Sequence, residues 1–147
     1  MNGSRPFDLH PRLAADCILL GRFSLCRVLL MNESRYPWLI LVPERAGITE
    51  ISELVDEDQR QLIRESSLLS VYLAKVFDAD KMNIAVIGNL VPQLHIHHIV
   101  RYRDDAAWPA PVWGRFDPAP YAGEAIEAVR RKMALESLPG FHAAGGY

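Results

Sequence analysis

Apolar residues recur with two different periods along the chain, and the change of period separates expected strands from expected helices. The first part of the chain contains apolar, partly β-branched segments at residues 17–20, 24–31 and 38–42. Gly21-Arg22 separates the first two, and a Gly-X pair suits a type II′ hairpin turn. We therefore predict three antiparallel strands, the first two joined by a two-residue turn.

A helical period begins at Asp56. This residue stands three places before Gln59, as in a capping box. The apolar residues that follow are spaced by seven, four and three, at Leu62, Leu69, Leu73 and Val76. We expect one long helix from Asp56 to about Phe77, closed by residues 78–80.

The second half of the chain returns to the strand period and then to the helical one. Residues 81–87 and 93–101 predict two strands joined by a short turn. Apolar residues at helical spacing then predict an amphipathic C-terminal helix: Ala122, Ile126, Val129 and Met133. We expect the tail from Pro139 to fray, because it carries three glycines.

These elements predict an α+β fold. It has a five-stranded antiparallel sheet, one long helix after the third strand and a C-terminal helix. The length predicts a single domain, 1–147. We expect a leader over residues 1–16 that packs across the rest, and a C-terminal extension over 102–147 that is rich in Pro and Trp and then helical.

Composition excludes several classes of protein. Lys and Arg total 16 against 18 Asp and Glu, so the net charge is −2. The chain therefore has no surplus of positive charge for a surface that binds nucleic acid. No apolar run approaches the roughly 18 residues that span a bilayer, and the first residues lack the apolar region of a secretory signal. We expect a cytoplasmic protein with neither nucleic acid nor membrane as a partner.

Two cysteines cannot form a disulfide framework. If the hairpin loop is Gly21-Arg22, then Cys17 and Cys26 face each other, because each lies four residues from the turn. A disulfide between them is geometrically conceivable. A reducing cytoplasm favours two buried thiols instead.

Three of the five histidines fall within four residues, at His95, His97 and His98. Because side chains alternate on a strand, Gln93, His95 and His97 share one face. His98 lies on the other face, with Leu94, Ile96 and Val100. We expect His98 to be a packing residue with its polar atoms satisfied.

The row of Gln93, His95 and His97 has three interpretations. It can be a half-exposed polar row on a sheet surface. It can be part of a zinc site, although no partner pair stands at ligand spacing elsewhere. It can also serve covalent catalysis, in which a neutral imidazole attacks phosphorus and neighbouring donors stabilise the phosphoryl oxygens.

The segment around these histidines resembles the histidine triad (HIT) superfamily of nucleotide hydrolases and transferases. The residues Gly88-Asn-Leu-Val-Pro-Gln-Leu-His-Ile-His-His-Ile-Val-Arg101 fit the family's histidine strand without a gap. Weaker matches precede it at Leu30–Asn32, Leu39–Pro43, Asp56–Gln59 and Asn83-Ile84. The Gln-x-His-x-His form, followed by the Trp-Pro and Val-Trp-Gly of residues 108–114, is similar to a bacterial-type subgroup.

The resemblance implies a role for each motif residue. His95 takes the place of the nucleophile and His97 that of a donor to a phosphate oxygen. Gln93 replaces the family's first histidine and cannot titrate. Asn89 stands where the family usually has Gln and would have to reach the leaving-group oxygen.

Four further residues are candidates for substrate binding: Asn32, Asn83, Arg101 and Trp108. By the resemblance, Asn32 contacts the nucleoside, although an Asn that ends a strand in a turn explains it equally well. Arg101 shares the His95 face and is a candidate for phosphate. Trp108 and Trp113 stack on a base, cover a neighbouring subunit, or pack the Pro-rich loop onto the sheet.

Taken together, the resemblance implies a homodimeric hydrolase or nucleotidyltransferase. It would act on a dinucleoside polyphosphate, such as a diadenosine polyphosphate, or on an adenylyl conjugate, through a nucleotidyl-histidine intermediate on His95. It implies no required cofactor beyond a divalent cation that accompanies the substrate phosphates. Two alternatives are a catalytically weak purine-nucleotide binding module with the same fold, and a protein that binds a metal through its histidines.

Overall fold

The computed structural model describes residues 5–145. Within this range one antiparallel sheet has six strands in the order β4-β5-β3-β2-β1-β6. The strands are β1 (Cys17–Arg22), β2 (Cys26–Met31), β3 (Trp38–Pro43), β4 (Lys81–Val86), β5 (Ile96–Arg101) and β6 (His142–Ala143). The helices are α1 (Pro11–Asp16), α2 (Asp56–Val76) and α3 (Ala125–Met133), with 3-10 turns at Ile51–Glu53 and Leu135–Ser137.

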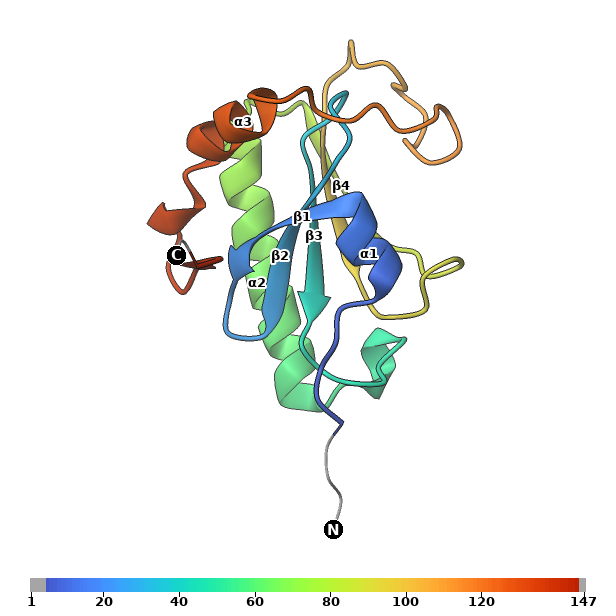
Figure 1. Ribbon diagram of the computed structural model, residues 1–147, viewed down its shortest axis with the longest axis vertical. Helices are drawn as coiled ribbons and strands as arrows, with labels where there is room; N and C mark the ends of the chain where they lie inside the picture. Colours follow the sequence, from blue (N-terminus) through green and yellow to red (C-terminus); the bar gives the residue numbers. More distant parts are fainter. Residues whose placement is uncertain (1–4, 146–147) are drawn as a thin grey trace.

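Each face of the sheet has its own apolar cluster. Helices α1 and α2 lie on opposite faces of the sheet (Figure 1). On one face α2 packs Leu62, Leu69 and Leu73 against the sheet. On the other face Leu13 of α1 and Val112 of the Pro/Trp-rich segment pack against it. The central strand β3 is buried at every position because both faces are covered. The α+β class is therefore confirmed, with six strands in place of five.

The first hairpin turns two residues later than predicted. Gly21 and Arg22 belong to β1, and the turn is residues 23–25, closed by a bond from the Phe23 N–H to the Cys26 carbonyl. The carboxylate of Glu65 on α2 accepts the N–H groups of Leu25 and Cys26. A side chain on a distant helix therefore stabilises the turn, a contact that no local pattern reveals.

The changed register separates the two cysteines. Cys17 pairs with Met31 and Cys26 pairs with Pro43, so they do not face each other, and both are free thiols. Burial raises the pKa of Cys17 to about 12, with the charge of Asp16 adding to the effect. The disulfide alternative is wrong for this structure.

The long helix α2 begins at Asp56 as predicted, but not through a capping box. Val55 is the N-cap and gives no side-chain bond, and the Gln59 amide donates to the Leu54 carbonyl. Three acidic residues in the first turn complement the positive end of the helix dipole. The helix ends at Val76, and Asp78 turns the chain away with a positive φ.

The described part of the tail is ordered against the sheet, contrary to the expectation that it frays. Strand β6 pairs with β1 opposite Gly21 and Arg22. A Cβ at position 21 would collide with the His142 carbonyl oxygen and the Phe141 ring. Gly21 therefore admits β6, which explains a glycine inside β1. Residues 146–147 of this tail, and 1–4 of the leader, lie outside the described residues.

Candidate functional site

The histidine segment lies at the start of β5, between β3 and β4. The regular strand begins at Ile96, so Gln93, Leu94 and His95 precede it. The predicted alternation is nevertheless present, because the His95 and His97 rings lie together with their centroids 4.8 Å apart. His98 points to the opposite face, where it is completely buried and 2.8 Å from the hydroxyl of Ser66 on α2. His98 is a packing residue, as expected.

His95 is held in one tautomer by a main-chain acceptor. Its Nδ1 lies 2.7 Å from the carbonyl oxygen of Gln93. A carbonyl can only accept, so Nδ1 carries the proton and the lone pair of the neutral ring is on Nε2. Burial lowers the pKa of His95 below its ordinary value of 6.5, which favours this neutral form. His95 therefore has an unprotonated Nε2 at neutral pH.

His97 is held in the complementary tautomer. The indole N–H of Trp38 donates to its Nδ1 over 3.0 Å, so the proton of the neutral ring is on Nε2. Burial lowers the pKa of His97 to about 3, with smaller contributions from His95 and His98. The rings of Trp38 and Trp113 pack edge-on against His97. Adjacent rings thus present one nitrogen lone pair and one N–H donor.

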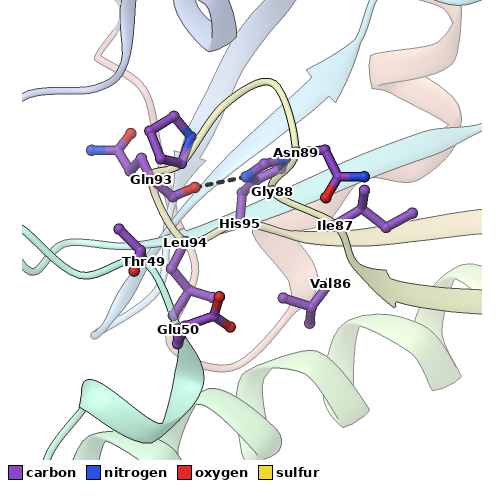
Figure 2. A pocket seen from close by; sticks show the side chains of 10 residues that line it. Thr49, Glu50, Val86, Ile87, Gly88, Asn89, Gln93, Leu94 and His95 are labelled. Atoms are coloured by element: carbon purple, nitrogen blue, oxygen red, sulfur yellow. Dashed lines mark hydrogen bonds between the residues drawn. The ribbon is translucent and has the colours of Figure 1, made fainter.

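A cavity of about 550 Å³ opens beside His95. Its walls come from the segment before β5, the end of β4 and the loop that follows β3 (Figure 2). Gly88 and Asn89 lie next to the His95 ring, on the side away from the Gln93 carbonyl. Asn89 is exposed at this cavity. The structure therefore brings together His95, Asn89 and the main chain of Gln93 at one cavity.

Gln93 makes contacts that were not expected of it. Its side chain binds the N-terminal leader, with Oε1 accepting the His10 N–H and Nε2 donating to the Asp8 carbonyl, each over 2.8 Å. Only its main-chain carbonyl touches His95. The sequence contained no signal for this contact, because its partners are main-chain atoms more than 80 positions away.

Arg101 and Asn83, both expected to bind substrate, are hydrogen-bonded to each other in the structure. Arg101 is 1% exposed and forms a two-bond pair with Asp105 at 2.7 and 3.0 Å. Its remaining donors reach the Asn83 side chain and the Ala110 carbonyl. The donors of Arg101 that would serve a phosphate hold the 102–110 segment, and neither Arg101 nor Asn83 lines the cavity at His95.

The Trp and Asn candidates also stabilise chain segments. The Trp108 ring covers the Arg101 guanidinium and Trp113 packs against Trp38, so both tryptophans pack the Pro-rich loop onto the sheet. Asn32 accepts the N–H of Tyr121 over 2.9 Å, which ties the C-terminal extension to the end of β2. None of Asn32, Asn83, Arg101 and Trp108 lines the cavity at His95.

The described residues do not support the metal alternative. Between residues 5 and 145 no group of three or more His, Cys, Asp or Glu side chains is placed to hold a metal ion. Of the two histidines on this face, only His95 has an unengaged nitrogen lone pair, because His97 accepts from Trp38 at Nδ1 and carries its proton on Nε2. No helix in this part of the chain is both long and apolar enough to span a bilayer.

Comparison with known proteins gives one consistent result. Residues 12–104 match the family model described as HIT domain. A histidine triad protein from Marinobacter aquaeolei VT8 is 54% identical, with a TM-score of 0.88 over 91% of this chain and 99% of that one. Histidine triad proteins from Bradyrhizobium japonicum and Sinorhizobium meliloti 1021 are 42% and 43% identical, with TM-scores of 0.86 and 0.85. They cover 88% and 87% of this chain, and 97% and 95% of their own. None of the curated proteins compared with the chain matches it.

Proposed function

Because the chain belongs to the histidine triad (HIT) family, whose members are generally nucleotide hydrolases or transferases, we propose that it cleaves a nucleotidyl phosphate bond through a covalent intermediate on His95. The substrate class is a dinucleoside polyphosphate, such as a diadenosine polyphosphate, or an adenylyl ester or phosphoramidate. One observation carries this proposal. The Gln93 carbonyl accepts a hydrogen bond from Nδ1–H of His95 over 2.7 Å, which leaves an unprotonated Nε2 beside a cavity large enough for phosphate groups.

The chemistry requires two displacements at one phosphorus. In the first, the Nε2 lone pair of His95 forms a bond to phosphorus, and the bond from phosphorus to the leaving group breaks. The leaving group departs with the electron pair and takes up a proton from solvent. In the second, the oxygen of a water molecule bonds to phosphorus, the nitrogen–phosphorus bond breaks, and Nε2 regains its lone pair as the water releases a proton to solvent. Splitting one hard step into two is the advantage of a covalent nucleophile.

Neighbouring groups support the developing charge. His97 offers an Nε2–H donor beside the His95 ring, and its low pKa keeps it in that neutral form. Donors fixed in place before the reaction stabilise a phosphoryl transition state without reorganisation. Asn89 is placed at the cavity to reach the leaving-group oxygen. All of these groups are side chains of this protein, so we propose no resident cofactor; a divalent cation enters only with the substrate phosphates.

The test is a search for the intermediate. The protein is mixed with diadenosine polyphosphate or an adenylyl phosphoramidate, quenched within milliseconds to seconds, and analysed by mass spectrometry. We expect an adenylyl adduct on His95 in the unmodified protein and in the control variant His142→Asn. We expect no adduct in His95→Asn, with turnover lower by at least about 10³-fold. Unchanged release of AMP by His95→Asn contradicts the proposal, and tight AMP binding with no hydrolysis of any substrate favours the binding module instead.

We also propose that the protein is a cytoplasmic homodimer, as the family resemblance implies. Strand β4 is one of the two edge strands of the described sheet. Its Ile84 and Val86 side chains are 50% and 43% exposed and lie opposite His98 and Ile96, on the α2 side of the sheet. An exposed apolar edge strand is a template for pairing with another chain. Two free thiols, at Cys17 and Cys26, fit a reducing compartment.

A further inference from the structure

The N-terminal leader is attached to the site through a single side chain. The Gln93 amide forms two hydrogen bonds of 2.8 Å, one to the Asp8 carbonyl and one from the His10 N–H. The main chain of the same Gln93 holds Nδ1 of His95. One residue therefore fixes the positions of both His10 and His95, although 85 residues separate the two histidines in the sequence.

The His10 side chain is held in a defined tautomer. Its Nδ1 accepts the N–H of Arg12 over 3.1 Å, so the proton of the neutral ring lies on Nε2. The ring is half-buried. Gln93, which binds the main-chain N–H of His10 and whose carbonyl binds Nδ1 of His95, lines the cavity. His10 is therefore a hydrogen-bond donor that is bound to a residue of the cavity wall, although it does not itself line the cavity.

The cavity lacks a group that compensates a phosphate. Among the residues that line it, only Glu50 carries a formal charge, and that charge is negative. Arg101 is bound by Asp105 and Asn83, and His97 stays neutral because its pKa is about 3. Phosphate binding requires N–H donors aimed at the oxygens. A second imidazole donor beside His95 would meet this requirement.

We propose that His10 contacts the substrate, its Nε2–H donating to a phosphate oxygen of the nucleotide bound at His95, and that Gln93 is the positioning residue that holds His10 there. This inference rests on the proposed function. It also gives a role to Gln93. The strand itself provides only His95 and His97 on this face, and the Gln93 amide holds a third imidazole, that of His10, beside them.

The decisive variant is His10→Asn. The Asn oxygen can replace Nδ1 as the acceptor for the Arg12 N–H, and Asn is a good N-cap residue, so α1 and the main-chain bonds to Gln93 are preserved. The matched control is His142→Asn, because His142 is exposed on β6 at the opposite edge of the sheet. Binding of AMP is measured by calorimetry, and turnover of diadenosine polyphosphate is measured in parallel.

We expect His10→Asn to weaken AMP binding and to lower kcat/KM by about 10- to 100-fold, the loss of one hydrogen bond to a charged group. Its thermal midpoint should match the unmodified protein, and His142→Asn should change neither quantity. Gln93→Ala should weaken AMP binding similarly. The double variant should be no worse than His10→Asn alone, because both changes remove the same contact.

The outcomes separate the two proposals. If the unmodified protein and His10→Asn bind AMP equally and turn over equally, the inference about His10 is overturned while the proposed function stands. Additive losses in the double variant overturn the positioning role of Gln93. If the unmodified protein neither binds AMP nor releases it from any adenylyl substrate, the proposed function fails, and the role of His10 fails with it.

Discussion

Trp38 donates its indole N–H to Nδ1 of His97 over 3.0 Å, across the pair of strands β3 and β5. This bond decides which nitrogen of His97 carries a proton, and therefore whether His97 offers a donor or an acceptor beside His95. Nothing in the local sequence around either residue indicates the pairing. The contact exists because β3 and β5 are adjacent in the sheet.

Trp38→Phe should impair catalysis while preserving the fold. The variant keeps an aromatic ring but leaves Nδ1 of His97 without its donor, so the useful tautomer is no longer enforced. We expect kcat to fall roughly 10- to 100-fold, as the transition state loses a positioned donor. The matched control is Trp113→Phe, which removes similar volume from the same aromatic cluster without removing that bond. Equal rates for the two variants would show that the tautomer of His97 is irrelevant.

The pH–rate profile should stay flat well below pH 6.5. A nucleophilic His95 must be neutral, and burial lowers its pKa, so protonation removes activity only when the pH falls through that lowered value. His97 stays neutral to about pH 3. The measurement is kcat/KM from pH 4.5 to 8. An acid limb centred at or above 6.5 would contradict a buried neutral nucleophile.

Stability should decrease in acid because of His98. Burial lowers its pKa to about 4 in the folded protein, whereas the unfolded chain takes up that proton near 6.5. The unfolded state therefore binds more protons between these values. The contribution of His98 is fully present above about pH 7 and is lost as the pH falls toward 4. At pH 4.5–5.5 the slope should be about 1.4 kcal/mol per pH unit for this one group.

Urea unfolding across this pH range measures that slope. His98→Asn lowers absolute stability, because the bond to Ser66 is disturbed, but it should also reduce the pH slope by about one proton. His142→Asn, on the exposed edge, should leave the slope unchanged. An identical slope in all three proteins would mean that His98 does not take up a proton on unfolding.

Asp105→Ala should destabilise the protein without changing the catalytic activity of the folded state. It leaves the guanidinium of Arg101 buried and without its counter-ion, which costs about 3–5 kcal/mol. Hydrogen bonds from Arg101 and from main-chain N–H groups outweigh burial and lower the pKa of Asp105, consistent with a stable pair. The neighbouring exposed Asp104→Ala should change stability by less than about 0.5 kcal/mol. If Asp105→Ala lost activity while its stability stayed unchanged, the result would assign Arg101 a role in the active site.

The assembly can be tested at the β4 edge. Replacing Ile84 and Val86 together by Lys places two charges on the exposed apolar strand and should convert a dimer to a monomer. Light scattering after size-exclusion chromatography measures the mass. The control is Leu19→Lys, since Leu19 is an exposed apolar residue on a different strand. A dimer that survives the β4 double variant would place the interface elsewhere.

Much of this architecture follows from the sequence. The apolar run of β3 and the spacing of apolar residues in α2 and β4 predicted these elements nearly to the residue, and helical spacing located α3, which begins at Ala125 and not at Ala122. Apolar spacing records which faces of an element are buried. The alternation at His95, His97 and His98 correctly separated the site from the core for the same reason.

Only the tertiary structure decided what each polar side chain does. Arg101, Asn83 and Asn32 looked available for substrate. In the structure Arg101 donates to Asp105, Ala110 and Asn83, and Asn32 accepts the N–H of Tyr121. Gln93 looked like a weakened catalytic residue and instead holds the leader. A hydrogen bond depends on two atoms meeting at about 3 Å, and one-dimensional periodicity carries no information on contacts between distant segments. The sequence therefore predicts which residue types form the site, whereas the hydrogen-bond partners of these residues are decided only when distant segments meet in the folded chain.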